Sequence, residues 1–370
     1  MTALQTAVVV VALLAPALLA FAARSAQRQQ RALPSLRPCA LDAPLLVIVP
    51  ARNEEARLGL TLRALLADPF PHLRVIVVDD RSTDGTVDVV SRLDDERLQL
   101  LSLATEPPRG TFGKPRAVHA GITAPGPATD LVAVIDADVV VEPGLLGALV
   151  RVRREMGADA VSGVPRLDNR SFIEELLVPA FVAAVGATHP PAAVNEGRTA
   201  FLNGQLMLLR RAALDDVGGF EAVSHTVLED VALARLFRAK GKKLLLVDAR
   251  ALACTRMYSS AREILEGFGK NARALHGDKL VPLGLLLASV ACLPWLVLAA
   301  AWCSDGVVDD VVAGLAWFSC VGLTMFNRWQ LRSSPWLALL SPLAHAIVAA
   351  VFVRAAVVRH ASWRGRTFST

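Results

Sequence analysis

Two apolar stretches decide the fold: L-L-V-I-V-P at residues 45–50 and R-V-I-V-V-D-D at residues 74–80. Each is a continuous aliphatic and β-branched run, which is typical of a strand buried on both faces in a parallel sheet. Between them, Asn53, Glu54 and Glu55 open a helical stretch with acidic residues in its first turn. The pattern therefore predicts a βαβ unit.

A third stretch, L-V-A-V-I at residues 131–135, predicts another buried strand that is followed by acidic residues. Ser82-Thr83-Asp84-Gly85 reads as a turn that leads from the second strand into a further helix. The alternation predicts a doubly wound α/β domain with a mostly parallel sheet. Acidic side chains would then gather at the carboxyl ends of the strands, where such sheets bind ligands.

The composition indicates that part of the chain faces lipid. Of 370 residues, 54% are hydrophobic and only 20% are charged, and the mean hydropathy is +0.45. Nearly charge-free runs occupy residues 3–23, 281–303, 311–326 and 336–358. We expect a transmembrane anchor at 1–24, a globular domain at 41–278, a membrane region of two or three helices at 281–358, and a basic tail at 359–370.

The charges beside the first apolar run predict its orientation. Arg24, Arg28, Arg31 and Arg37 follow that run, which places the globular domain of a multi-pass cell-membrane protein in the cytosol. A cleaved signal peptide is the alternative, but the amino end lacks the basic residues of a secretory signal. Nucleic acid is excluded as a partner, because no aromatic platform accompanies the basic residues. Nothing in the sequence indicates an oligomeric state.

Residues 171–188 form an apolar stretch inside the expected globular domain, interrupted by Glu174, Glu175 and Pro179. Two interpretations stay open. The stretch is either a core helix of the globular domain or an interfacial helix lying on the membrane near a lipid acceptor.

Acidic residues fall at the expected strand ends and helix starts in four clusters: Asn53 with Glu54 and Glu55, Asp79 with Asp80, Asp136 with Asp138, and Glu229 with Asp230. A single cluster of this kind is as well explained by a helix cap. The spacing of Asp136-Ala137-Asp138 lets both carboxylates reach one hard divalent cation, Mg2+ or Mn2+, that is shared with phosphate oxygens. Such a cation neutralises the charge of a diphosphate leaving group.

These motifs together resemble the family 2 glycosyltransferases, which have the GT-A fold, a nucleotide-binding α/β domain. The resemblance covers about residues 43–278. Its parts, in order, are V-I-V-P-A-R-N-E-E (47–55), V-V-D-D-R-S-T-D-G-T (77–86), G-K-P-R-A-V-H-A-G-I (113–122), D-A-D (136–138), N-G-Q (203–205) and L-E-D (228–230).

The resemblance implies a role for each matching residue. The nucleotide would be lined by Pro50, Ala51, Asn53 and Glu54, contacted at its base or ribose by Asp80, and approached by Lys114. Asp136 would face the sugar or ribose, and Asp138 would ligate the metal. Asp230, with Glu229 beside it, matches the general base of an inverting transfer. The first turn of a helix also favours acids at 229 and 230.

The acceptor side is less sharply marked. The amides of Asn203-Gly204-Gln205 suit sugar hydroxyls, although Asn-Gly is also a common turn pair. Polysaccharide synthases of the family usually carry Q-x-x-R-W where this chain reads T-R-M-Y-S-S at 255–260. We therefore expect transfer of a single sugar, with Arg256 and Tyr258 among the acceptor-binding residues.

The segment around Arg256 and Tyr258 most resembles the branch of the family that glycosylates carotenoid or hopanoid-type lipids. The resemblance implies a UDP-sugar as donor and a hydroxyl or carboxyl of a carotenoid- or terpenoid-like membrane lipid as acceptor. Transfer to polyprenyl phosphate, or synthesis of a cell-envelope polysaccharide, is the nearest alternative. A non-catalytic nucleotide-sugar-binding membrane protein is an alternative of another class.

Two other nucleotide-binding classes are excluded by the sequence. The stretch G-T-F-G-K at 110–114 superficially matches a P-loop, but its first glycine is misplaced, and Pro115 stands where Ser or Thr is needed. No G-x-G-x-x-G follows the first strand. The chain is therefore neither a P-loop NTPase nor a Rossmann dehydrogenase.

Overall fold

The computed structural model describes residues 24, 28–29, 31–40, 43–68, 70, 72–276, 280–302, 307–357, 360–363 and 366–369. The chain divides into two compact units. The sheet unit comprises residues 32–168 and 189–257, and the helical unit comprises residues 1–31, 169–188 and 258–370. The expected anchor at 1–24 lies, but for its last residue, outside the described residues.

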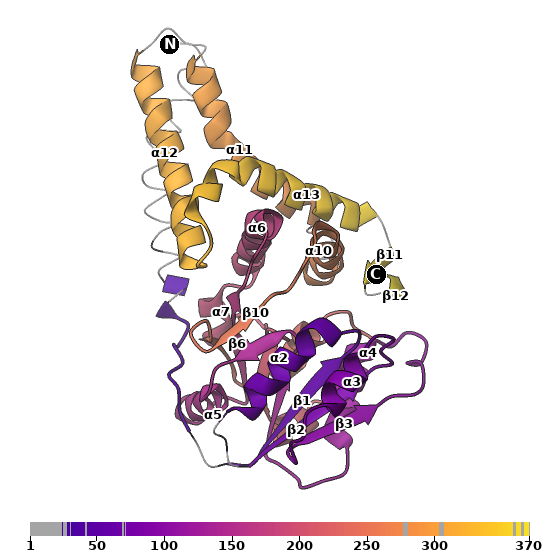
Figure 1. Cartoon of the computed structure of the whole chain (residues 1–370). Coiled ribbons are helices and arrows are strands. Elements are labelled where there is room, and N and C mark those ends of the chain that lie inside the picture. The colour runs from indigo at the N-terminus through magenta and orange to yellow at the C-terminus, as the bar shows by residue number, and fades with distance from the viewer. Residues whose placement is uncertain are drawn as a thin grey trace. The chain divides into compact units, whose positions relative to one another are not determined.

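The sheet unit is an α/β structure (Figure 1). Its strands are β1 (Leu45–Ala51), β2 (Leu73–Asp79), β3 (Leu98–Ser102), β4 (Leu131–Ile135), β5 (Val139–Val141), β6 (Ala160–Val164), β7 (Arg166–Leu167), β8 (Leu206–Arg210), β9 (Leu244–Asp248) and β10 (Ala253–Thr255). Its helices are α2 (Glu55–Leu66), α3 (Thr86–Ser91), α4 (Gly113–Thr123), α5 (Leu145–Met156), α7 (Pro191–Asn195), α8 (Arg211–Asp215) and α9 (Glu229–Ala239).

The main sheet has the strand order β3-β2-β1-β4-β8-β6-β9. All neighbouring pairs are parallel except the two that β8 makes with β4 and β6. The expected mostly parallel α/β sheet is therefore confirmed, and so are the strands predicted at 45–50, 74–80 and 131–135. A second sheet, of order β5-β10-β7, lies in the same unit.

The apolar strand sequences follow from burial on both faces of the main sheet. Alternate residues of β1 enter two separate cores: Leu45 and Val47 pack on one side, and Leu46 and Ile48 on the other. The first core includes Leu58, Leu62 and Leu65 of α2, and the second includes Val118 of α4 and Phe237 of α9. Since both faces are covered, side chains alternate without a polar face, and the strand reads as continuously apolar.

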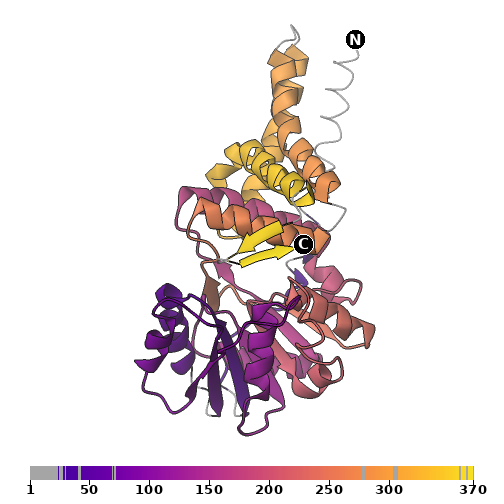
Figure 2. The ribbon, with the colours of Figure 1, turned by 90° about the vertical axis from the view of Figure 1, so that its right-hand side faces the viewer.

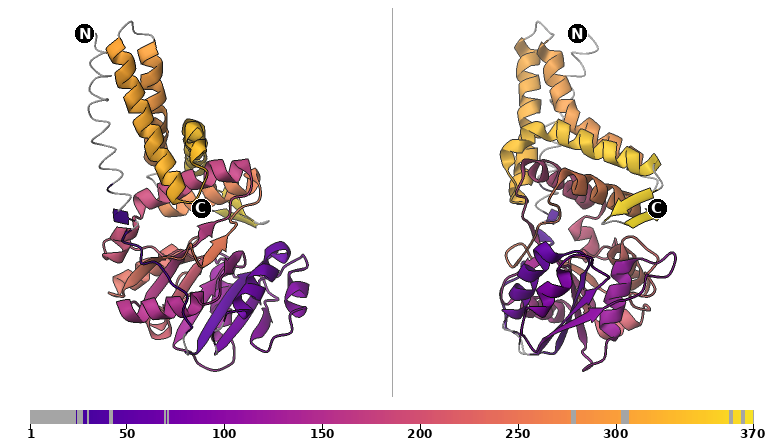
Figure 3. Two further views of the ribbon diagram at one scale, coloured as in Figure 1. Left: turned by 60° about the vertical axis from the view of Figure 1, so that its left-hand side comes forward. Right: turned by 45° about the vertical axis from the view of Figure 1, so that its right-hand side comes forward.

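The helical unit contains α6 (Phe172–Thr188), α10 (Ala261–His276), α11 (Leu280–Trp302), α12 (Val307–Gln330), the 3-10 helix η2 (Pro335–Leu340), α13 (Ser341–Val357) and the hairpin of β11 (His360–Trp363) and β12 (Arg366–Ser369). Helices α11 and α12 run side by side, and α6, α10 and α13 pack together (Figures 2 and 3). The ring of Phe181 on α6 stacks on Phe268 of α10 at 4.0 Å and meets Phe352 of α13 edge-on at 6.3 Å. Helix α6 therefore buries its apolar face inside the helical unit.

The start of α6 is fixed by a buried charge within the helical unit. Arg328, on α12, is only 6% exposed. Its guanidinium donates to the carbonyl oxygens of Ser334, at 2.7 Å, and of Glu175, at 2.5 Å. The Glu175 carboxylate in turn accepts the backbone N–H of Ser334 at 2.9 Å. This network ties the first turn of α6 to the turn between α12 and η2.

Two helical stretches among the described residues are long and apolar enough to cross a membrane. They are Phe172–Asn195, with a mean hydropathy of 1.4, and Pro335–Val357, with a mean hydropathy of 2.1. The second coincides with the apolar run expected at 336–358. Length and composition alone support these candidates, and a buried core helix passes the same test.

Candidate active site

The carboxyl ends of β1 and β2 form the first part of the candidate site. Ala51 and Asp79, the last residues of these strands, are paired in register. The backbone N–H of Asp80 donates to the carbonyl oxygen of Ala51 at 2.8 Å. The parallel pairing thus places Pro50, Ala51 and Asp80 together, although they are some thirty residues apart in sequence.

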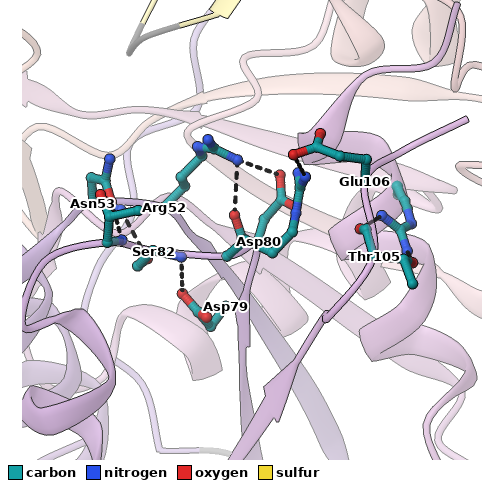
Figure 4. A network of polar contacts seen from close by, with 10 residues as sticks. Arg52, Asn53, Asp79, Asp80, Ser82, Thr105 and Glu106 are labelled. Carbon is teal, nitrogen blue, oxygen red and sulfur yellow. Dashed lines mark hydrogen bonds and ion pairs between the residues drawn. The ribbon is translucent and has the colours of Figure 1, made fainter. Parts of the chain in front are cut away.

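Asn53 and Glu54 join the loop after β1 to the loop after β2. Asn53 has a φ of 53°, a left-handed conformation that asparagine tolerates better than most residues. Its side-chain oxygen accepts the backbone N–H of Thr83 at 2.8 Å, and its own N–H donates to Ser82 Oγ at 3.0 Å (Figure 4). The N–H of the buried Glu54 donates to Thr86 Oγ1 at 2.8 Å. Both residues therefore hold the two loops in place.

The carboxylate of Asp80 is surrounded by arginine. Arg81 donates from Nε and Nη2 to Asp80 Oδ1 at 3.0 and 2.7 Å, and Arg52 Nη1 lies 3.9 Å from Asp80 Oδ2. Figure 4 shows Arg52 reaching over Asp80. Burial raises the pKa of Asp80 above its usual range, and the two arginines offset part of that rise.

Lys114 brings together segments that are far apart in sequence. From the first turn of α4 its Nζ lies 2.7 Å from Asp136 Oδ1, 3.0 Å from Glu229 Oε1 and 3.4 Å from the carbonyl oxygen of Gly204. Burial lowers the pKa of Lys114, but the carboxylates of Asp136, Glu229 and Asp230 outweigh burial and raise it overall. Lys114 is therefore a permanent cation among three acids.

Asp230 lies in the first turn of α9 and is oriented by backbone donors. Its Oδ2 accepts the N–H of Gly204 at 2.7 Å, and its Oδ1 accepts the N–H of Val231 at 2.8 Å. Burial and the neighbouring Glu229 raise the pKa of Asp230 to about 6, while Lys114 and the two backbone N–H groups act in the opposite direction. A carboxylate with this pKa is mostly ionised at neutral pH and can accept a proton.

The two acids of the D-A-D motif follow β4. The N–H of Asp136 donates to the carbonyl oxygen of Gln205 at 3.0 Å, and Asp138 Oδ2 lies 3.9 Å from Arg57 Nη1. Among the residues that the structure describes, no three or more His, Cys, Asp or Glu side chains could hold a metal ion by themselves. The pair nevertheless fits Mg2+ or Mn2+ on a nucleotide, since such an ion takes one or two protein carboxylates and completes its shell with phosphate oxygens and water.

The residues expected on the acceptor side do not all belong to the same unit. Asn203 and Gln205 are held beside Lys114 and Asp230 by the short turn before β8, where Asn203 Oδ1 accepts the N–H of Gln205 at 3.3 Å. Arg256 follows β10 in the sheet unit. Tyr258 belongs to the helical unit, where it is only 4% exposed and packs edge-on against Phe268 at 5.5 Å.

Several residues of the site were not predicted from the sequence. Arg52 and Arg81 lie inside motifs that were recognised, yet roles were given to their neighbours and not to the two arginines. Arg57, beside Asp138, carries no local signal because its partner is far along the chain. Thr61 of α2 is buried and donates to the carbonyl oxygen of Ala137 at 2.8 Å, which fixes the backbone of the D-A-D motif.

The chain is similar to curated and solved glycosyltransferases. A curated relative, the 4,4'-diaponeurosporenoate glycosyltransferase of Staphylococcus aureus strain MRSA252, is 25% identical over 233 residues. The match covers 61% of this chain, and the chain spans only 60% of that relative's length. The same protein from strain USA300 matches with the same identity and coverage.

A solved structure shares the fold. It is the mannosyltransferase PcManGT of Pyrobaculum calidifontis in complex with GDP-Man and Mn2+, with a TM-score of 0.54 and 18% identity. The match covers 95% of this chain and 98% of the other. A model of the family described as "Glycosyltransferase like family 2" matches residues 43–272, well over half of the chain. The expected resemblance is thereby confirmed, and the chain belongs to glycosyltransferase family 2.

Proposed function

We propose that the chain transfers one sugar from a nucleotide-sugar donor to a hydroxyl or carboxyl of a membrane lipid, with inversion of the anomeric carbon. The observation that carries this proposal is the convergence on Lys114. Lys114 forms ion pairs with Asp136, after the end of β4, and with Glu229, at the start of α9, and it also contacts the carbonyl oxygen of Gly204. A protein that only bound a nucleotide-sugar would not need an oriented carboxylate with a raised pKa at this place.

Asp230 is the general base of the proposed reaction. It removes the proton from the acceptor hydroxyl as that oxygen attacks the anomeric carbon, and the bond from this carbon to the diphosphate breaks with its electron pair. The products are the glycosylated acceptor, a nucleoside diphosphate and protonated Asp230. Where the acceptor is a carboxylate, no proton has to be removed. The N–H of Gly204 holds the base in position.

Asp138, and Asp136 next to it, are the residues we assign to a divalent cation. When bound, Mg2+ or Mn2+ supplies positive charge to the leaving diphosphate. The donor set supports this assignment, since two carboxylates at one strand end match the requirement of such an ion on a nucleotide. Lys114 is a second source of positive charge in the same place, and it holds the Asp136 carboxylate at 2.7 Å.

The ends of β1 and β2 are the proposed site of the nucleotide. Pro50, Ala51, Asn53 and Glu54 line it and Asp80 contacts the base or ribose. The support is that the strand pairing and the loop contacts of Asn53 gather these residues at one edge of the sheet. On the acceptor side, we assign binding to Asn203, Gly204, Gln205 and Arg256 of the sheet unit. The expected role of Tyr258 stays a prediction of its own, since that residue belongs to the helical unit.

The acceptor we propose is a carotenoid- or terpenoid-like lipid at the cell membrane. The curated relatives are named for a diaponeurosporenoate acceptor, and two helical stretches have the length and composition of membrane spans. An acceptor that stays in the bilayer requires an enzyme that is held there. We further propose that the chain crosses the membrane several times, with anchors at 1–24 and 281–358. The catalytic domain, at 41–278, lies in the cytosol, and a basic tail follows at 359–370.

Labelled nucleotide sugars test the proposal. Membranes that contain the full chain are incubated with a panel of UDP- and GDP-sugars and a lipid extract, and labelled lipids are identified by mass spectrometry. One labelled lipid species is expected. Label in long glycan would indicate polysaccharide synthesis. Label in polyprenyl phosphate would show that this lipid, and not a carotenoid- or terpenoid-like lipid, is the acceptor.

Asp230→Asn provides the catalytic control for that experiment. The variant should bind the donor and transfer no sugar to a hydroxyl acceptor. Asp88→Asn is the matched variant, because Asp88 is an exposed acid in the first turn of another helix, α3. Full turnover by Asp230→Asn would remove this residue from the role of base, whereas no transfer by the unaltered chain with any donor would count against the enzyme itself.

A further inference from the structure

A buried serine lies in an apolar strand of the main sheet. Ser162 is the third residue of β6, which reads A-V-S-G-V and lies between β8 and β9. The residue is 0% exposed. A hydroxyl that leaves water for an apolar interior costs free energy unless it forms hydrogen bonds. Alanine or valine would meet no such cost at this position, so the partners of Ser162 indicate what its hydroxyl does.

The hydroxyl of Ser162 bonds two backbone groups of one residue, Asn203. Ser162 Oγ accepts the N–H of Asn203 at 2.7 Å and donates to its carbonyl oxygen at 3.0 Å. The same carbonyl oxygen accepts the N–H of Leu206 at 3.3 Å, which closes the turn before β8. The serine therefore fixes the peptide groups on both sides of Asn203, where this turn begins.

One rigid peptide group connects Ser162 to Asp230. The carbonyl group of Asn203 and the N–H of Gly204 belong to the same planar peptide, which we call the 203–204 peptide, so the two groups can only rotate together. Ser162 holds the carbonyl end of this peptide at 3.0 Å. The N–H end donates to Asp230 Oδ2 at 2.7 Å. The serine hydroxyl thus fixes the direction from which a backbone donor meets the carboxylate.

The residue after Ser162 allows the turn to approach β6 closely. A Cβ on Gly163 would lie 2.4 Å from Leu206 Cδ2 and 3.0 Å from the Cβ of Ala249, so a larger residue would push the start of β8 away. The carbonyl oxygen of Gly163 accepts the side-chain N–H of Asn203 at 3.2 Å. Two successive residues of β6 therefore hold the turn, one through its hydroxyl and one through its backbone.

We propose that Ser162 is a positioning residue of the transfer reaction, which orients the general base Asp230 through the 203–204 peptide. Without the hydroxyl, both backbone groups of Asn203 lose this partner, and the peptide is free to rotate away from the carboxylate. The inference rests on the proposed function, since it requires that Asp230 removes a proton from the acceptor. It goes beyond that proposal because it places a determinant of the rate on a buried strand residue outside the sets assigned to donor, cation and acceptor.

Sugar transfer by the full chain tests the inference. The labelled nucleotide sugar and the lipid extract that give product with the unaltered chain are used to measure kcat for each variant in membranes. The dissociation constant of the nucleoside diphosphate released from that sugar is measured in detergent by calorimetry with Mn2+. Ser162→Ala should lower kcat by about tenfold or more. It should leave the dissociation constant unchanged, because the proposed nucleotide site lies at the ends of β1 and β2.

A pair of substitutions separates the hydroxyl from the packing of the strand. Ser162→Thr and Ser162→Val introduce side chains of the same shape, and only threonine carries a hydroxyl. Ser162→Thr should therefore restore most of the rate, while Ser162→Val should lose as much as Ser162→Ala. The matched control is Val161→Ala. Val161 is the preceding residue of β6, is also 0% exposed and packs in a core on one face of the sheet, so this variant should keep its kcat.

The outcomes separate the role of Ser162 from the proposed function. Full kcat in Ser162→Ala, or equal kcat in Ser162→Thr and Ser162→Val, would overturn the positioning role. An equal loss in Val161→Ala would overturn it as well, because the effect would then come from strand packing. Asp230→Asn is measured in the same series. Full turnover by that variant would count against the proposed base, and no transfer by the unaltered chain would count against the enzyme itself.

Discussion

Lys114→Met should change the pH dependence of the reaction. With the lysine in place, Asp230 has a pKa of about 6. If Asp230 is the base, as proposed, it acts only in its ionised form, so kcat/KM should be constant above neutral pH and fall tenfold per unit well below pH 6. Lys114 lowers the pKa of Asp230. Methionine fills a similar volume without the charge, and its introduction must therefore raise that pKa.

The expected size of the shift comes from the range that pairs of opposite charges usually show. An opposite charge within a few ångströms lowers a carboxyl pKa by about 1–3 units. The side chain of Lys114 is 33% exposed, so water screens part of its field and the lower end of that range applies. A pKa near 7 in Lys114→Met would reduce the ionised fraction of Asp230 at pH 6 from about one half to about one tenth.

The measurement is kcat/KM for the donor between pH 5 and pH 9, with a fixed Mn2+ concentration. The acid limb of the profile should move upward by about one unit in Lys114→Met. Lys114→Arg keeps the charge and should keep the limb near 6. Lys242→Met removes a lysine that pairs with Asp216 at the surface of the same unit, and serves as the matched control. An acid limb that stays at pH 6 in Lys114→Met would refute the electrostatic argument.

Three further substitutions probe other contacts. Gly204→Ala would place a Cβ 2.7 Å from Asp230 Oδ2 and displace that carboxylate, so kcat should fall by about tenfold to a hundredfold. The control is Gly186→Ala, whose new Cβ would have no atom within 4 Å and which should keep full turnover. Asp138→Ala should weaken UDP binding about tenfold in Mn2+ and leave binding in EDTA unchanged, as calorimetry in the two buffers would show. Phe181→Ala removes a ring that stacks on Phe268 at 4.0 Å and should destabilise the helical unit by about 3 kcal/mol. The temperature of thermal inactivation in detergent should therefore be lower. An unchanged temperature would show that this stack contributes little.

The local sequence pattern was sufficient to predict the parallel strands at the centre of the sheet. The runs that became β1, β2 and β4 are apolar because both faces are covered, and such a run is recognisable without its neighbours. The direction of β8 was not recognisable in this way. Leu206–Arg210 is as apolar as a parallel strand, and its antiparallel pairing depends on the path of the chain between β6 and β8.

The residues of the candidate site could be predicted from the sequence, but the contacts between them could not. The motifs around Lys114, Asp136 and Glu229 were recognised separately, but nothing in their spacing shows that the lysine pairs with both acids. Those pairs depend on how α4, β4 and α9 pack. The roles that the resemblance implies for these residues stay predictions until the variants are measured.

Helix α6 was the least predictable element, since a core helix and an interfacial helix have the same composition. Its partners lie about ninety to one hundred and seventy residues further along the chain, in α10 and α13. No local window contains that information. The sequence interval expected for one globular domain, 41–278, includes α6 and α10, yet both belong to the unit formed with the C-terminal helices.

This division of the chain has a practical consequence for protein production. A fragment that ends at residue 278 would retain α6 and α10 and lose α13, so the ring of Phe352 would no longer cover Phe181. The same cut removes Arg328, Ser333 and Ser334, so the carboxylate of Glu175 loses its ion pair with Arg328 and the hydrogen bonds from Ser333 Oγ and the Ser334 N–H. We expect such a fragment to expose apolar surface and aggregate. Crystallisation or enzymology of the sheet unit would therefore require the C-terminal helices, or a short polar linker in place of residues 169–188 and an end at residue 257.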